Sequence, residues 1–321
     1  MQLSTLDLIA RTPSLFGAGP LPTSPGFRLR AGHPINEGSG ADFFIDRLCA
    51  PLAAAFVAGE ERTDIAMSGC WQDGHWLARS GHLAGVFAAD LWDIPASGRV
   101  AFLRFGRFDR FEAGALVETI VLFDLPHLMI EAGVWPVGPA LSPLVTAPGP
   151  ATHDGTVAEA EPTESAASLA LVEAMIGGLH KFDGDLTTMR MTSYWHDDFW
   201  WFGPAPIGSF RGHKDYERGH QRPFLTAFPD RVGGNHAARI AQGPYVASTG
   251  WPSIRATHSG GDWLGLPATG RAITMRVMDF WRRDGDQLVE NWVMIDIPDL
   301  LLQMGIDVFA RMRALSPRKD K

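Results

Sequence analysis

The sequence has few cysteines and no excess of positive charge. Its 321 residues include only two cysteines, Cys49 and Cys70, too few for a disulfide framework or a Cys-based metal site. The 28 Lys and Arg residues are outnumbered by 36 Asp and Glu residues, which gives a net charge of −8 and a pI near 5.7. Nucleic acids and anionic membranes select for a basic face, so we expect neither as a partner.

Long apolar runs are also missing. No stretch is long enough to span a bilayer, and the first residues lack the basic and apolar regions of a secretory signal. We therefore expect a cytoplasmic protein. With 45% hydrophobic and 20% charged residues, a chain of this length suits two globular domains of ordinary size.

The common cofactor motifs are absent as well. The chain has no Walker A loop, no dinucleotide fingerprint, no nucleophile elbow and no two-histidine zinc helix. We expect no cofactor and no metal, which leaves a cofactor-independent acid/base enzyme or a binding protein. The chain has 11 Trp residues against 3 Tyr, and tryptophans of this number build a core or line an apolar pocket.

An internal repeat is the most informative feature that is present. Residues 94–133 recur at 266–305 with a constant offset, since 267 − 95 = 172 and 305 − 133 = 172. Many positions match identically, including the pairs Pro95/Pro267, Gly98/Gly270, Arg104/Arg276, Phe108/Phe280 and Asp124/Asp296. Two copies of one sequence imply two copies of one fold.

A Pro- and Gly-rich stretch separates the copies. Residues 136–164 carry several prolines and no sustained hydrophobic periodicity, which is typical of a linker. We therefore predict one domain at 1–135 and a second at 165–321. Helical spacing of apolar residues predicts a helix over 165–180 at the start of the second copy. The first copy has little room before its repeat, so its opening helix must be short, displaced or absent.

Each copy then follows the same order of elements. A short strand, at 27–30 or 198–202, precedes a helical segment, at 40–56 or 212–228. Extended patterns follow, and hairpin turn signals occur at 112–114 and 283–286. The predicted strands lie near 75–79, 99–111, 115–124, 244–249, 271–283 and 287–296. Helices followed by a meander of strands indicate an α+β fold.

The last predicted strand offers the strongest candidate site. Side chains alternate along a strand, so its even-numbered residues share one face: Glu290, Trp292, Met294 and Asp296. Two carboxylates beside an indole and a thioether describe an enclosed pocket with an acid/base group. In the first copy the carboxylates persist as Glu118 and Asp124, which mark a second, degenerate pocket.

Both carboxylates of the second copy also have a structural interpretation. Asp296 is placed to cap a helix over 300–304, and its repetition as Asp124 fits capping equally well. Glu290 is placed to pair with an arginine of the adjacent strand, either Arg276 or Arg282.

Loop and strand residues near the tryptophans are further candidates. His258 lies in a Gly-rich loop close to Trp263, where it forms either a mobile polar lid or an ordinary solvated loop. His196 directly precedes a predicted strand, where a role at the mouth of a pocket and a surface position are both open. Trp200 follows in that strand and belongs to the cluster of tryptophans expected at the pocket.

An ordered set of motifs resembles the SnoaL-like polyketide (ester) cyclase family. The resemblance covers residues 165–306, and the first copy shares it more weakly through its likeness to the second. The motifs that carry it are Phe202-Gly203-Pro204-Ala205-Pro206-Ile207-Gly208, Phe228-Pro229-Asp230, Thr257-His258-Ser259-Gly260, Pro267-Ala268-Thr269-Gly270-Arg271, Glu290-Asn291-Trp292, Asp296 and Gln303-Met304-Gly305.

The resemblance implies a fold and a reaction. The fold is a cone like that of nuclear transport factors, in which a curved antiparallel sheet wraps around helices and leaves a deep apolar pocket. Cyclases of the family close a ring by intramolecular aldol condensation without cofactor or metal, and an aspartate removes a proton next to a carbonyl. Asp296 is matched to that base. Arg282 lies near the position of the family's histidine, and His258 could reach in from its loop.

The expected activity follows from this match. We predict that the second copy acts on a small apolar carbonyl compound, with a non-catalytic binding protein and a hydratase or isomerase using the same pocket as alternatives. Trp292, Glu290, Met294, Trp263, His196 and Trp200 are the expected substrate contacts. The two copies are expected to pack as a pseudo-twofold pair within one chain, and we leave open a homodimer of whole chains.

Overall fold

The chain forms two six-stranded sheets with the same strand order. The computed structural model describes residues 3–21, 24–72, 74–142 and 144–315. Residues 1–2 of the first predicted domain and 316–321 of the second therefore lie outside the described part. The first sheet has the order β2-β1-β6-β5-β4-β3, and the second has the order β8-β7-β12-β11-β10-β9. Identical topology in both halves confirms the predicted duplication of an α+β fold.

The first half of the chain combines a long antiparallel meander with short helices. Its elements are α1 (Thr5–Ala10), β1 (Arg28–Ala31), β2 (Glu37–Ser39), α2 (Ala41–Phe44), a π-helical turn (Ile45–Cys49), α3 (Ala50–Ala55), β3 (Phe56–Trp71), β4 (Gly74–Phe87), β5 (Val100–Glu112), β6 (Ala115–Phe123) and α4 (Leu125–Glu131).

The second half repeats this order behind a longer opening helix. Its elements are α5 (Pro162–Leu179), two 3-10 turns (Leu186–Met189 and Met191–Ser193), β7 (Trp195–Phe202), β8 (Ser209–Arg211), α6 (Gly212–Tyr216), a π-helical turn (Glu217–Gln221), α7 (Arg222–Ala227), β9 (Ala238–Gln242), β10 (Tyr245–Thr257), β11 (Ala272–Asp284), β12 (Gln287–Ile295), α8 (Ile297–Gln303) and α9 (Val308–Leu315).

The repeat extends to the register of the strands. Arg28 pairs with Glu118 in the first sheet, and Trp200 pairs with Glu290 in the second, at the same offset of 172. Both of these pairings, β1 with β6 and β7 with β12, are parallel, whereas the other strand pairs are antiparallel. Each sheet is therefore mixed, and the resemblance had implied an antiparallel one.

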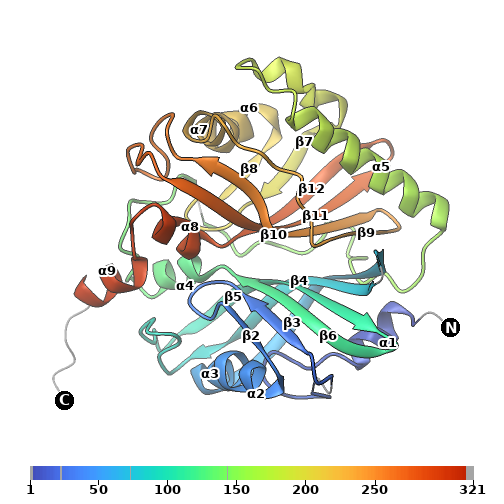
Figure 1. The fold of residues 1–321 in the computed structure, drawn as a ribbon, viewed down its shortest axis with the longest axis vertical. Helices are drawn as coiled ribbons and strands as arrows, with labels where there is room; N and C mark the ends of the chain where they lie inside the picture. Colours follow the sequence, from blue (N-terminus) through green and yellow to red (C-terminus); the bar gives the residue numbers. More distant parts are fainter. Residues whose placement is uncertain (1–2, 22–23, 73, 143, 316–321) are drawn as a thin grey trace.

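The two sheets pack back to back, with helices on their outer faces (Figure 1). The apolar layer between them includes Phe108 and Phe280, equivalent residues whose ring centroids lie 5.7 Å apart. The other buried members of the layer are Ile65, Met67, Trp76, Ala78, Ile120, Leu122, Ala147, Val157, Phe202, Ala238, Ile240, Tyr245, Ala247, Met278, Trp292 and Met294. Contact between equivalent residues indicates a pseudo-twofold axis through this layer.

Several local predictions match the observed elements. The helix predicted over 165–180 is α5, and the hairpin signal at 283–286 is the turn between β11 and β12, where Gly285 has φ +55°. The opening helix of the first copy is short, because α1 has only 6 residues. The extent of β3 was missed, because this strand begins with a polar run that includes Glu60 and Glu61. No helix in the described ranges has the length and apolar character needed to cross a membrane.

The stretch between the copies is held in place by contacts with both sheets. Trp292 donates its indole N–H to the carbonyl of Pro148 (2.7 Å), and Ala151 N–H donates to the carboxylate of Glu290 (3.2 Å). Thr156 forms a parallel bridge with Ala66 of β3. The predicted linker therefore lies against both sheets and closes part of the layer between them.

Candidate active site

A cavity of about 510 Å³ lies in the second domain, on the face of its sheet that is turned away from the first domain. Residues of α5, the π-helical turn, α7 and strands β7, β10, β11 and β12 line it. Its walls are largely aromatic and aliphatic, with three tryptophans among them: Trp195, Trp201 and Trp281. A concave apolar site of this size suits a small organic ligand.

The odd-numbered residues of the two central strands form the sheet wall of the cavity. These residues are Met275, Val277, Asp279 and Trp281 of β11, with Asn291, Val293 and Ile295 of β12. Their even-numbered neighbours point the other way and join the apolar layer between the sheets. Strand alternation thus assigns one face to the cavity and the other to the domain interface.

Asp279 is the one acidic residue among the described residues that line the cavity. Burial raises the pKa of its carboxyl from the ordinary value of 3.8 to about 7, and a hydrogen bond from Asn291 and the charge of Arg239 lower it only in part. The side-chain amide of Asn291 donates to Asp279 over 3.4 Å and to the carbonyl of Phe280 over 3.1 Å. A carboxyl with a pKa near neutrality can both accept and return a proton at physiological pH.

The π-helical turn and the end of α6 supply polar groups to the same cavity. Tyr216, His220 and Gln221 all line it, and burial lowers the pKa of His220 to about 3, so this imidazole is neutral. Nδ1 of His220 and Nε2 of Gln221 are buried and bond to no described residue. The His220 ring stacks on Trp201 with centroids 4.2 Å apart, which fixes its orientation. These groups are free to hydrogen-bond a polar atom of a ligand.

The pocket predicted from the even-numbered residues of β12 is wrong. Trp292 and Met294 are buried in the layer between the sheets, and Trp292 stacks on Phe202 with ring centroids 5.7 Å apart. Glu290 forms an ion pair with Arg282, as the structural interpretation anticipated, and also accepts from the linker. The face was misassigned because both faces of this strand are buried, and one of them is covered by the other domain.

Asp296 lies between the domains and outside the cavity. Its carboxylate caps α8 by accepting from the N–H of Asp299 (3.3 Å), and it also accepts from the N–H of His33 (2.9 Å) and from Arg276 (3.0 Å). Capping is therefore confirmed. Burial raises the pKa of Asp296 to about 6, but no described ligand cavity reaches it.

The equivalent Asp124 does the same in the first domain. It caps α4 through the N–H of His127 (3.2 Å) and accepts from the N–H of Ala205 (3.0 Å) in the second domain. Ala205 corresponds to His33, since 205 − 33 = 172. Glu118 forms ion pairs with Arg30 and Arg110, each over 3.2 Å. The carboxylates expected to mark a second pocket thus belong to a symmetric interface and to ion pairs.

The remaining candidates also lie away from the cavity. His258 is fully buried, with ring nitrogens against the carbonyl of Gly261 (3.1 Å) and the hydroxyl of Thr269 (3.3 Å), so both the mobile lid and the solvated loop histidine are wrong. Trp263 is buried against Phe228 with ring centroids 5.3 Å apart. His196 is exposed and accepts from the N–H of Asp198. Trp200 is partly exposed and lies under the guanidinium of Arg211.

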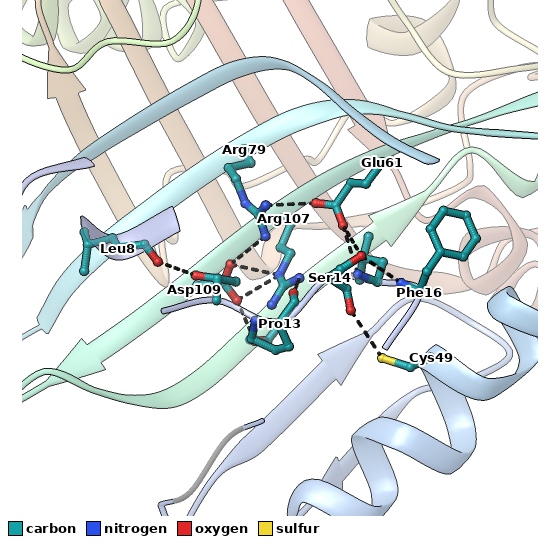
Figure 2. Close-up of polar contacts among 12 residues, drawn as sticks. Leu8, Pro13, Ser14, Phe16, Cys49, Glu61, Arg79, Arg107 and Asp109 are labelled. Carbon is teal, nitrogen blue, oxygen red and sulfur yellow. Dashed lines mark hydrogen bonds and ion pairs between the residues drawn. The ribbon is translucent and has the colours of Figure 1, made fainter. Parts of the chain in front are cut away.

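The corresponding region of the first domain is filled. Arg107 stands where the second domain has Asp279, and it donates to Asp109 (2.8 Å) and to the carbonyl of Pro13 (2.8 Å) (Figure 2). Arg79 bridges Glu61 (2.8 Å) and Asp109 (3.6 Å). The segment 12–18 lies against these charges: Leu15 is fully buried and its N–H donates to Glu61 (2.9 Å). The first domain thus has a buried ion network in place of an open acid-bearing cavity.

One sequence signal pointed to the residues that were missed. Asp279 is a lone carboxylate in an apolar run, Val277-Met278-Asp279-Phe280-Trp281, and its equivalent in the first copy is Arg107. A charge reversal at a matched position shows that the surroundings of this residue differ between the copies. Tyr216, His220 and Gln221 also differ from their equivalents, which are Phe44, Leu48 and Cys49. Their approach to the cavity could not be predicted, because it depends on the π-helical turn.

Comparison with known proteins finds a family match in the second half of the chain. Residues 184–304 match the family model described as SnoaL-like polyketide cyclase, so this part of the second half is similar to that family. No curated protein sequence matches the chain.

Three solved structures illustrate the structural matches. AclR of Streptomyces galilaeus, named as a proposed hydroxylase, is 23% identical over 44% of this chain and 97% of its own, with a TM-score of 0.36. IdmH of Streptomyces antibioticus, named as a proposed polyketide cyclase, is 24% identical over 42% of this chain and 98% of its own, with a TM-score of 0.34. An NTF2-like protein of Burkholderia xenovorans is 15% identical over 44% of this chain and 97% of its own, with a TM-score of 0.35.

Proposed function

We propose that the second domain is a cofactor-independent acid/base enzyme that promotes aldol-type ring closure of a small, largely apolar carbonyl compound. The observation that carries the proposal is Asp279, a buried carboxyl with a pKa of about 7 in an otherwise uncharged part of the cavity. General acid/base catalysis is most effective when the pKa of the group lies near the working pH. The family model that matches residues 184–304 covers the strand that carries Asp279.

The proposed reaction moves one proton and forms one carbon–carbon bond. The Asp279 carboxylate takes a proton from the carbon next to a carbonyl, and the resulting enolate attacks a second carbonyl of the same molecule. The protonated Asp279 then returns its proton to the new alkoxide, so that atoms and charge balance. Tyr216 and Gln221 line the same cavity and are available to donate hydrogen bonds to the enolate oxygen. Burial raises the pKa of Tyr216, which keeps its hydroxyl protonated as a donor.

Proton abstraction can be tested without knowing the natural substrate. With 2-tetralone as a probe, deuterium exchange at the carbon next to the carbonyl is followed by NMR in D₂O. We expect the wild-type protein to accelerate exchange, with a rate that rises with pH and levels off above about 7. Asp279→Asn should reduce the enzymatic exchange by about 100-fold or more, because general bases contribute roughly 10²–10⁴-fold.

Asp296→Asn is the matched control. It removes a buried aspartate of raised pKa that lies outside the cavity, so exchange should persist in the folded variant. Loss of exchange in folded Asp296→Asn, with retention in Asp279→Asn, would contradict the assignment. Binding of 2-tetralone without any exchange by the wild-type protein would instead identify a binding protein.

A further inference from the structure

The opening of the cavity carries a cation that no described carboxylate neutralises. Among the lining residues, His180, Val232 and Gly234 are exposed, so they mark the opening. Arg231 lies beside them, with its guanidinium 5.1 Å from the ring centroid of Phe182. Burial lowers the pKa of Arg231, and no described carboxylate offsets this effect or forms an ion pair with it. A partly desolvated guanidinium without a counter-ion favours an anionic ligand.

Other hydrogen-bond donors surround Arg231. The backbone N–H groups of Gly233 and Gly234 donate to no described residue, and Gly234 has the left-handed φ of +87°. The His180 imidazole lies over these glycines, since a Cβ at Gly233 would be 3.6 Å from its Nε2. His236 also lines the cavity and contacts the hydroxyl of Ser248 over 2.9 Å. Each of these groups is neutral or cationic.

The nearby carboxylates are engaged elsewhere. Asp230 precedes Arg231 in the chain, but its side chain accepts from the N–H of Thr257 (2.7 Å) and does not line the cavity. Glu173 of α5 pairs with Arg239 over 3.4 Å. Asp279 lies within the cavity, on the central strand β11. Asp183 and Asp185 follow Phe182, but they accept from the N–H groups of Asp185 (3.1 Å) and Thr187 (2.9 Å) and do not line the cavity. The described residues that line the opening thus include a guanidinium and no carboxylate, whereas the chain as a whole has a charge of −8.

We propose that this opening is a carboxylate-binding subsite and that the substrate of the second domain is an organic acid. Arg231, the N–H groups of Gly233 and Gly234, and His180 hold its carboxylate at the solvent-exposed end. Its apolar body extends into the aromatic cavity and brings an enolisable carbonyl to Asp279. This arrangement keeps the anionic group of the substrate hydrated at the rim and away from the Asp279 carboxylate. Only the role given to the buried end of the substrate rests on the proposed function.

A matched pair of probes isolates the charge. 2-Naphthoate and 2-naphthamide have nearly the same shape, and calorimetric titration of the full chain gives the affinity of each. We expect the wild-type protein to bind 2-naphthoate at least about 10-fold more tightly than 2-naphthamide, with the preference decreasing as salt is raised. Arg231→Gln should weaken 2-naphthoate binding by about 10-fold and leave 2-naphthamide binding nearly unchanged.

Arg255→Gln is the control for loss of a positive charge near the opening. Arg255 pairs with Val232 through its backbone, but its side chain is exposed and does not line the cavity. This variant should retain the preference for 2-naphthoate. Equal affinity for the two probes, failure of the wild-type protein to bind 2-naphthoate, or an equal loss for both probes in Arg231→Gln would each overturn the proposal.

The same titrations separate this inference from the proposed function. Asp279→Asn should still prefer 2-naphthoate, because the carboxylate contact is at the opening. A preference that depends on Arg231, together with undiminished exchange in Asp279→Asn, would support the subsite and refute the catalytic role of Asp279. The reverse result, exchange that depends on Asp279 without a preference for 2-naphthoate, would refute the subsite and support the catalytic role.

Discussion

Identical and differing residues of the repeat have different roles. Asp124 and Asp296 are identical because each caps a helix and accepts a backbone N–H from the other domain. Asp279 and Arg107 occupy one matched position with opposite charges, and only Asp279 lines an open cavity. The sequence match had selected Asp296 as the catalytic base, although a residue shared by both copies is explained first by the fold that they have in common. The proposed acid/base chemistry therefore lies where the copies diverge.

The raised pKa of Asp279 predicts a pH-dependent difference in stability between the wild-type protein and Asp279→Asn. The neutral carboxyl is favoured in the folded state, so its contribution is fully present below the ordinary pKa of 3.8 and is lost as the pH rises through about 7. Asparagine does not ionise. The melting temperature of Asp279→Asn should therefore rise relative to wild type between pH 4.5 and pH 8, by at least about 2 °C.

Thermal unfolding followed by circular dichroism at these two pH values checks this expectation. A difference in melting temperature that is the same at both values would show that Asp279 ionises normally in the folded protein.

Equivalent elements also diverge between the domains. Both copies contain a π-helical turn at the same position, Ile45–Cys49 and Glu217–Gln221, but it presents the apolar Leu48 in one and His220 in the other. The segment after α1 has its own role, because Leu15 fills the first domain and Pro13 accepts from Arg107. Helix α5 and the hairpin turns at 112–114 and 283–286 were predictable from local patterns and turn residues, whereas helix α9 was not predicted. The packing of segment 12–18 against the first domain was not predictable, because its partners are distant in sequence.

Leu15→Ala tests the contribution of this segment. Leu15 is fully buried, and removing such a side chain should lower the free energy of unfolding by about 2–5 kcal/mol. Leu6→Ala is a matched control, because Leu6 is 55% exposed and should matter little. Urea unfolding measures both, and 2-naphthoate titration should show the second-domain cavity unaffected. Equal stability of the two variants would mean that segment 12–18 does not pack in the first domain in solution.

The two copies of the fold pack against each other through their sheets. Their shared apolar layer contains Phe108 against Phe280, and the hydrogen bonds Asp124–Ala205 and Asp296–His33 are related by the same offset of 172. Helix α9 adds a contact across the domains through Arg313 and Asp93 (2.8 Å). Each domain therefore protects a face of the other that would otherwise expose a large apolar surface.

The Phe108–Phe280 contact can be measured with a double-mutant cycle. Phe108→Ala and Phe280→Ala should each lower the free energy of unfolding by about 3–5 kcal/mol. The double variant should lose less than the sum, by about 0.5–1.5 kcal/mol, because the rings contact each other. Urea unfolding of the four proteins gives these values. Strictly additive losses would show that the two rings are not in contact in solution.

The sequence by itself determined the duplication, the order of elements and the α+β class, because these depend on local periodicity, turn residues and an offset that can be counted. It also contained the caps of α4 and α8, since capping is a local interaction. Only the tertiary structure decided which face of β12 borders the cavity. Both faces are apolar, and the packing of one sheet on the other leaves the odd-numbered face for a ligand. The same packing encloses Glu290, Trp292, Met294 and Asp296 between the domains and leaves Asp279 as the acid in the cavity.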